Sequence, residues 1–61
     1  MKRYKIEYMW NGYKMIHLDS TYVNISKLVD DLFQHDVESV QIYILNKDYV
    51  YEYLLTINNR R

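Results

Sequence analysis

Apolar and polar side chains alternate along the first part of the chain. Over residues 2–9, Tyr4, Ile6 and Tyr8 alternate with Arg3, Lys5 and Glu7. A period of two with one apolar side predicts a half-buried strand. The alternation resumes over residues 13–19, with Ile16 and Leu18 on one face and Tyr13, Met15, His17 and Asp19 on the other. The Asn11-Gly12 pair between the two runs predicts a β-hairpin.

The connection in this hairpin decides which faces meet. A two-residue turn would pair Ile16 with Glu7 and would put the apolar side of one strand opposite the polar side of the other. A three-residue loop pairs Ile16 with Ile6 instead. We therefore expect a type I turn that starts at Trp10 and ends with Gly12 in the left-handed conformation, forming a bulge. Trp10 would then leave the ladder, and either fold back on the sheet or stand exposed as a binding residue.

The periodicity changes after residue 24. Ile25, Leu28, Val29, Leu32 and Phe33 follow the i, i+3, i+4, i+7, i+8 spacing of one helical stripe. This spacing predicts an amphipathic helix over residues 24–35. Asn24 is the expected N-cap, because its side chain can accept a hydrogen bond from a free amide of the first turn.

Two further alternating runs, residues 38–45 and 49–57, predict a second hairpin with its turn at Asn46-Lys47 or Lys47-Asp48. The sequence thus predicts a small α+β domain of order ββαββ, in which one helix packs on one face of a four-stranded, mainly antiparallel sheet. We expect residues 1–61 to form a single domain, with residues 58–61 frayed. Strands of one hairpin should pair, while the order of the hairpins stays open.

The alternation also predicts what each face of the sheet carries. Under the helix we expect Tyr4, Ile6, Ile16, Leu18, Val40, Ile42, Ile44 and part of the row Tyr49, Tyr51, Tyr53. On the other face we expect Met15, Tyr43, Leu45, Val50 and Leu54, mixed with Lys5, Glu7, His17, Gln41 and Glu52. Such a mixture is typical of interaction surfaces, although ordinary surfaces also expose much apolar area.

The composition indicates how the domain is stabilised. A chain of 61 residues buries a limited core, and the absence of cysteine excludes disulfides and thiolate metal sites. Association, most simply as a symmetric homodimer, is the expected supplement. No run approaches the ~20 apolar residues of a membrane span and no signal peptide is visible, so we expect a cytoplasmic protein. Many Tyr, Ile and Asn codons beside no Ala or Pro indicate an A/T-rich genome, such as that of a phage or mobile element.

Residues with catalytic or metal-binding potential are few. His17 and Asp19 share a strand face as a possible base and orienting carboxylate, but an exposed polar pair is the simpler interpretation. Asp30-Asp31 and Asp36-x-Glu38 lack the ligand spacing of a calcium loop. One glycine allows no phosphate-binding loop. We therefore expect no enzyme activity, no cofactor and no metal.

The function that these observations favour is a non-catalytic protein–protein interaction module. We expect it to self-associate and to regulate or inhibit a larger protein. The acidic helix residues could enter a basic groove on that partner, or simply keep the domain soluble. The predicted partner-binding residues are Trp10, Met15, Tyr43, Leu45, Val50, Leu54, Asp30 and Asp31.

The alternative is a small nucleic-acid-binding regulator. The formal net charge is zero, but residues 1–14 carry +3, residues 15–59 carry −5 and residues 60–61 carry +2. The basic residues for this function would be Lys2, Arg3, Lys5, Arg60 and Arg61. The tyrosines could stack on bases, but their neighbours Asp48 and Glu52 argue against a broad nucleic-acid surface.

Overall fold

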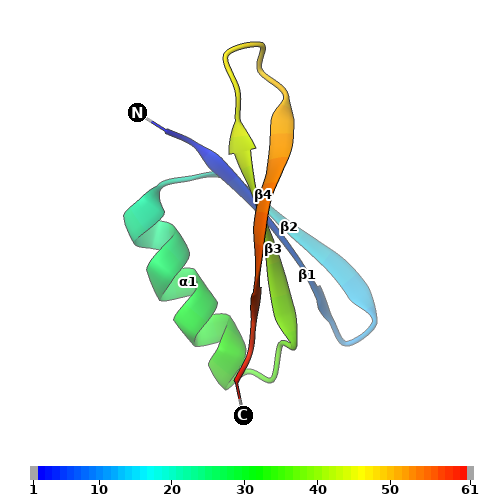
Figure 1. Ribbon diagram of the computed structural model, residues 1–61. Helices are drawn as coiled ribbons and strands as arrows, with labels where there is room; N and C mark the ends of the chain where they lie inside the picture. The colour runs from blue at the N-terminus through cyan, green and yellow to red at the C-terminus, as the bar shows by residue number, and fades with distance from the viewer. Residues whose placement is uncertain (1, 61) are drawn as a thin grey trace.

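The computed structural model describes residues 2–60 and has the predicted ββαββ order (Figure 1). The elements are β1 (Tyr4–Trp10), β2 (Tyr13–Ser20), α1 (Tyr22–Gln34), β3 (Ser39–Leu45) and β4 (Tyr51–Asn58). The strands form one antiparallel sheet in the order β2-β1-β3-β4. Both predicted hairpins pair, and their first strands lie side by side at the centre. The predicted small α+β fold is confirmed.

Helix α1 covers one face of the sheet (Figure 1). Of the predicted stripe, Ile25, Val29 and Leu32 are buried, while Leu28 and Phe33 are partly buried against the core. The sheet contributes buried side chains from its two central strands: Ile6, Tyr8, Val40 and Ile42. The core is therefore centred on β1 and β3. The single short helix covers the apolar side chains of these two strands.

The start of α1 differs from the prediction. The helix begins at Tyr22, and Thr21 is the N-cap, in an extended conformation with φ −91° and ψ 164°. The Thr21 carbonyl accepts the hydrogen bond of Ile25 N–H at 2.9 Å. Asn24, the predicted N-cap, lies inside the first turn. Thr21 makes no side-chain capping hydrogen bond, so its backbone carbonyl alone starts the helix.

The end of α1 buries a residue that the sequence analysis did not single out. Asp36 adopts φ 68°, and the N–H of Val37 donates to the Leu32 carbonyl at 3.2 Å. This is the Schellman arrangement, in which the residue after the left-handed position packs back on the helix. Val37 is accordingly 1% exposed.

The β1–β2 turn is a two-residue turn, so the predicted three-residue loop is wrong. Trp10 pairs with Tyr13 and remains in the ladder. Asn11 and Gly12 have φ 51° and 82°, the two positive values that a type I′ turn requires. This turn matches the twist of the flanking strands, and that match outweighed the better apolar pairing of the longer loop.

The shorter turn reverses the faces predicted for β2. Ile16 lies opposite Glu7 on the face away from α1, 52% exposed, and Leu18 is 59% exposed. Met15 packs against the core instead, and His17 lies opposite Ile6. The predictions that put Ile16 and Leu18 under the helix, and Met15 and His17 on the other face, were therefore wrong.

The β3–β4 loop has the geometry that we expected in the first hairpin. Asn46 N–H donates to the Val50 carbonyl at 2.9 Å, and Tyr49 N–H donates to the Asn46 carbonyl at 3.1 Å. Tyr49 takes the left-handed position with φ 61°. The loop thus has three residues, 47–49, and the predicted two-residue turn is wrong. Asn46 Oδ1 stabilises it by accepting the N–H groups of Asp48 and Val50 at 2.9 and 3.0 Å.

A β-bulge in β4 also changes a predicted face. Ile42 lies opposite Leu55, but the next residue, Tyr43, lies opposite Tyr53, so Leu54 is an extra residue. Tyr53 and Tyr51 therefore share the open face with Tyr43, and Leu54 turns to the helix side. The predictions of a tyrosine row under the helix and of Leu54 on the other face were wrong for this reason.

The end of β4 is tied to the helix. Asn58 is the last residue of β4, although we expected fraying from this position. Asn59 N–H donates to the Glu38 carbonyl at 2.8 Å, and its side-chain amide donates to the carbonyls of Phe33 and Val37 at 3.1 and 3.0 Å. These bonds satisfy one carbonyl in the last turn of α1 and two carbonyls in the segment that joins α1 to β3. Arg61, the end of the expected tail, lies outside the described residues.

The register of the first hairpin can be tested with one substitution at two positions. Ile6→Val should lower the free energy of unfolding by about 0.5–1.5 kcal/mol, because Ile6 is fully buried. Ile16→Val should change it by less than ~0.5 kcal/mol, because Ile16 is half exposed. Urea unfolding followed by circular dichroism measures both. Equal losses would contradict the two-residue turn.

The left-handed conformation of Tyr49 predicts that this residue costs stability. Tyr49→Gly should raise the free energy of unfolding by about 0.5–1 kcal/mol, because glycine adopts a positive φ without a steric penalty. Tyr49→Ala is the matched control, since it removes the ring and keeps the strain. If alanine stabilised the chain as much as glycine, the loss of the 86% exposed ring would be the cause instead.

Candidate functional site

A groove runs between α1 and the edge strand β4. Its volume is about 450 Å³. The helix and the sheet both line it, through Tyr4, Ile25, Ser26, Val29, Asp30, Phe33, Ile42, Leu54, Leu55 and Ile57. The side chains are mostly apolar, and Asp30 is the one carboxylate among them. We call this feature the α1–β4 groove.

The groove exists because α1 is centred over β1 and β3. The buried side chains of the helix meet those of the two central strands, so the helix side of β4 is only partly covered. The bulge enlarges the apolar lining, because Leu54 and Leu55 both turn toward the groove. These two leucines remain 46% and 41% exposed. A strictly alternating strand would present only one of them.

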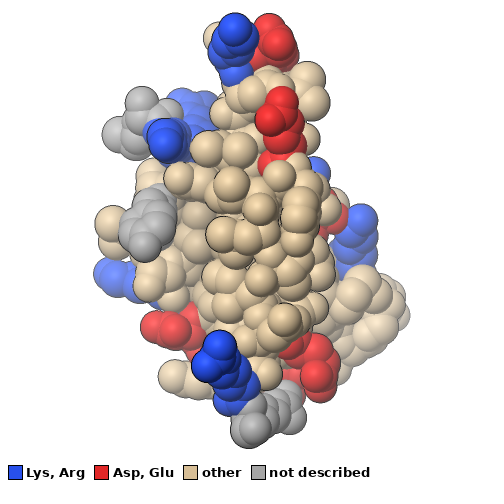
Figure 2. Space-filling model, in the orientation of Figure 1, with Lys and Arg blue, Asp and Glu red and all other residues tan. Residues whose placement is uncertain are grey.

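Strand β4 also has an unpaired outer edge. It pairs with β3 on one side and is the last strand in the sheet order. Glu52 is the single charged residue of the strand, and its Oε1 accepts the Asn46 side-chain amide at 2.7 Å. In Figure 2, uncharged side chains cover the middle of this face of the molecule, and acidic side chains lie at the upper end of β4 and around the margin. An apolar groove thus borders an edge with free backbone groups.

A second hollow lies near the end of α1. It has a volume of about 160 Å³ and is lined by Tyr8, Trp10, Met15, Leu32 and His35. It shares no lining residue with the α1–β4 groove. Trp10, 44% exposed, covers one side of this hollow from its place in the ladder. The tryptophan therefore belongs to the helix side of the sheet and not to an isolated loop tip.

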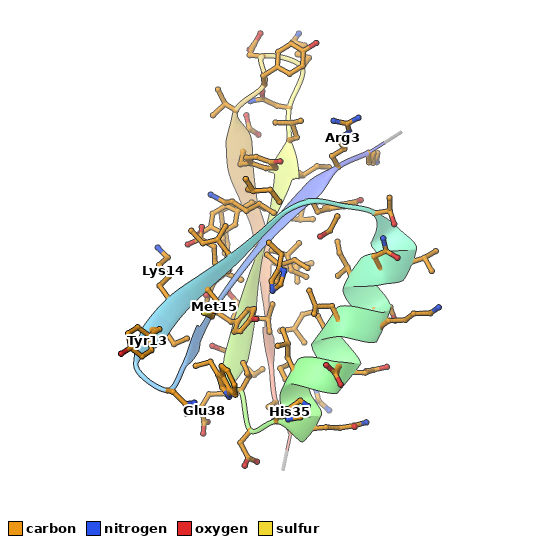
Figure 3. All side chains as sticks on the ribbon, turned by 180° about the vertical axis from the view of Figure 1, so that it is seen from behind. Arg3, Tyr13, Lys14, Met15, His35 and Glu38 are labelled. Atoms are coloured by element: carbon orange, nitrogen blue, oxygen red, sulfur yellow. The ribbon has the colours of Figure 1, made fainter. Side chains whose placement is uncertain are left out.

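The face away from α1, the open face, carries an ion-pair network around Glu7. The Glu7 carboxylate is bound by Lys14 at 2.7 Å and by Lys5 at 3.0 Å. Glu7 is only 6% exposed although no helix covers it. Lys5 also lies 4.3 Å from the centre of the Tyr43 ring. Figure 3 shows Lys14 directed away from α1.

The predicted partner-binding residues do not form one surface. They divide among several places: Leu54 and Asp30 at the groove, Trp10 and Met15 at the small hollow, Tyr43 and Leu45 on the open face, Val50 between the β3–β4 loop and the start of β4, and Asp31 on the exposed side of α1. Met15 was expected on the open face and lies on the helix side. Leu55 and Ile57 also line the groove and were missed as site residues, because nothing in the alternation shows how far α1 reaches over β4.

The residues expected to carry acid–base chemistry are engaged or isolated. The hydroxyl of Tyr8 lies 3.0 Å from His17 Nε2, and the two rings stack with centroids 5.6 Å apart. The side chain of Asp19, the predicted partner of His17, is not described. Asp31 Oδ1 lies 3.8 Å from His35 Nε2 on the exposed side of α1. Across residues 2–60, no three His, Cys, Asp or Glu side chains come together as a metal site would require.

The basic residues near the chain ends are separated in space. Arg3 lies at the end of the molecule away from Glu38 (Figure 3), whereas Arg60 follows Asn59, whose backbone N–H donates to the Glu38 carbonyl at 2.8 Å. Lys5 is held on the open face by Glu7. These side chains therefore do not make one continuous basic patch.

The single helix of the described chain is too short and too polar to cross a bilayer.

The Glu7 network predicts a specific acid dependence of stability. The pKa of Glu7 lies below its usual value, first because of the hydrogen bond from Lys14 and then because of that from Lys5. A carboxylate with a lowered folded pKa stabilises the fold above its unfolded pKa, and this contribution is lost as the pH falls through the folded pKa. We expect the wild type to lose this stability below about pH 4.5, and Glu7→Gln to lack this part of the loss.

Urea unfolding at pH 7 and pH 3 measures the effect. Glu38→Gln, which removes an exposed carboxylate, controls for the change in net charge. Parallel losses in the wild type and in Glu7→Gln would contradict the network.

Comparisons with known proteins do not add to these observations. No protein-family model, curated protein or solved structure matches the chain. The function therefore has to be argued from the surface of the molecule. The feature of that surface with a definite shape and chemistry is the α1–β4 groove beside the edge of β4.

Proposed function

We propose that the chain is a non-catalytic protein–protein interaction module that binds an extended polypeptide segment along β4. The observation that carries this proposal is the position of the α1–β4 groove directly beside an unpaired strand edge. In strand addition, main-chain hydrogen bonds to the edge supply affinity, and alternate side chains of the added segment enter neighbouring pockets. Both requirements meet on this side of the domain.

The size and lining of the groove support a peptide ligand. A volume of about 450 Å³ lies within the range of ligand-binding clefts, and it is large enough for more than one apolar side chain. Leu54 and Leu55, each close to half exposed, would become buried by such a segment. Asp30 and Ser26 on the helix provide polar groups at the margin. The lining offers shape and apolar contact, which favours binding over catalysis.

The size and composition of the chain support further statements on its location, association and origin. We infer a cytoplasmic protein that self-associates as a homodimer or binds a larger protein, and that acts by regulating or inhibiting that protein. The A/T-rich codon usage implied by the sequence is the support for a phage or mobile-element origin. The need of a 61-residue chain for additional buried surface is the support for association.

Selection from a random peptide library tests the proposed function. Peptides enriched on the immobilised chain should be extended and apolar, and their affinity should fall by about tenfold or more for Leu55→Lys. Leu18→Lys is the matched control, because it places the same charge on an exposed leucine of the open face. Binding is measured by calorimetry with synthetic peptides. Peptides that bind both variants equally, or the absence of any binder to a chain that is itself monomeric, would overturn the proposal.

A further inference from the structure

The two edges of the sheet differ in how well they are protected from pairing. Native edge strands usually carry charges that prevent association. The sequence of β2 contains the charged residues Lys14 and Asp19, whereas that of β4 contains a single charge, Glu52, near its start. Over the rest of its 8 residues β4 is uncharged. The outer edge of β4 is therefore the less protected of the two.

The backbone of β4 is available for pairing near its C-terminal end. Asn59 N–H donates to the Glu38 carbonyl at 2.8 Å, which fixes the phase of the ladder with β3. In an antiparallel ladder, hydrogen-bonded and non-hydrogen-bonded residue pairs alternate. By this alternation Thr56 and Asn58 direct their N–H and C=O groups away from β3. These groups lie on the outer edge.

The bulge makes the pattern of β4 symmetric. Tyr51 and Tyr53 point to the open face, and Thr56, whose hydroxyl lies 2.7 Å from that of Tyr53, points there as well. Leu54 and Leu55 both point to the groove side. From Tyr51 to Leu54 the side chains therefore alternate between the open face and the groove side, starting on the open face. From Leu55 to Asn58 they follow the same order in reverse, so the pattern is identical from either end of β4. In a strictly alternating strand, a two-fold axis between residues 54 and 55 would place a side chain on the groove side opposite one on the open face.

This symmetry is what an antiparallel pair of identical strands requires. In a two-fold interface, residue i of one copy meets residue j of the other and j meets i. An axis between Leu54 and Leu55 places Leu54 opposite Leu55 of the second copy and Tyr53 opposite Thr56. Directly opposite residues point to the same face of a sheet. Every pair along β4 then matches groove side with groove side and open face with open face.

The charges are compatible with the same arrangement. Glu52 would lie opposite Ile57, so the two Glu52 side chains would be about 17 Å apart along the strands, well beyond the ~8 Å screening length at physiological salt. Arg60, just beyond the end of β4, would lie beside the segment of the other copy that carries Asp48 and Glu52. Like charges are thus separated and opposite charges approach.

We propose that two copies of this chain pair antiparallel through the outer edges of β4, about a two-fold axis between Leu54 and Leu55, to form one eight-stranded sheet. The inference rests on the proposed function, and it identifies the extended segment that pairs with the outer edge of β4 as the β4 strand of a second copy. A standard interface of ~800 Å² per partner would use about a sixth of the 4859 Å² surface of the domain. The four leucines at the axis would form its centre.

Sedimentation equilibrium over a wide range of concentrations tests the association. The wild type should show a species of twice 7.6 kDa. Leu55→Lys and Thr56→Pro should each weaken dimerisation by about tenfold or more, because one buries a charge and the other removes an N–H of the outer edge. Leu18→Lys and Ile16→Pro make the same changes on the open face and on the β2 edge, and they should leave dimerisation unchanged. Circular dichroism checks that each variant is folded.

Cysteine cross-linking tests the register independently of these variants. The chain contains no cysteine, so each variant carries a single thiol. Leu55→Cys, next to the axis, should form a disulfide-linked dimer on mild oxidation, whereas Asn58→Cys should not, because its copies would be more than ~20 Å apart along the strands. Equal cross-linking at the two positions would overturn the register.

The outcomes separate this inference from the proposed function. A chain that stays monomeric, or a dimer lost in Leu18→Lys and kept in Leu55→Lys, overturns the β4 pairing. If such a monomer still binds selected peptides through Leu55, the module function stands and its partner is another protein. If peptides fail to bind as well, both are overturned.

Discussion

The pleat of a strand places successive side chains on opposite faces. One residue more or less in a turn or strand therefore moves all later side chains of that strand to the other face. Two single-residue features account for the faces that differ from the prediction, beside a further irregularity in the β1–β2 pair, where Tyr4 lies opposite Ser20 and Ile6 opposite His17. The two-residue turn at Asn11-Gly12 sends Ile16 to the open face and Met15 to the core. The extra residue Leu54 moves Tyr51 and Tyr53 to the open face and keeps Leu55 and Ile57 at the helix. The composition of each surface follows from these two places.

The elements themselves could be predicted because their signals are local. The helical stripe depends on spacing within α1, and the two hairpins depend on alternation within each run. The turns were predicted with their lengths exchanged: the first was judged by how well apolar residues would pair, and the second was placed at Asn46-Lys47 or Lys47-Asp48 between two alternating runs. In the structure the backbone decided instead: Asn11 and Gly12 both tolerate the positive φ of the short turn, and Asn46 hydrogen-bonds two amides of the longer loop.

The exposed residues on β2 show why pairing of apolar residues was a poor guide. One helix of 13 residues covers the two central strands, and little apolar area beyond them can be buried. Ile16 and Leu18 can therefore stay exposed without any loss to the existing core. Glu7, opposite Ile16, is shielded by Lys5 and Lys14, and Lys5 Nζ lies over the Tyr43 ring. The ion pairs shield Glu7 on this face, and its apolar side chains stay in contact with solvent.

The same limit explains why the candidate site lies at β4 and could not be read from the sequence. A strand at the edge is only partly reached by α1, so its helix side becomes the wall of a groove. The bulge then adds a second leucine to that wall, at a position that strict alternation assigns to the other face. Bulges often serve to prevent pairing, because they interrupt the ladder. Here the bulge lies between two half-strands whose faces mirror each other, so its effect on pairing depends on the partner: it disfavours a regular strand of unrelated sequence and fits a strand with the same extra residue. The β4 strand of a second copy carries the same extra residue at the same position, and it therefore has the mirrored arrangement of faces that this edge requires.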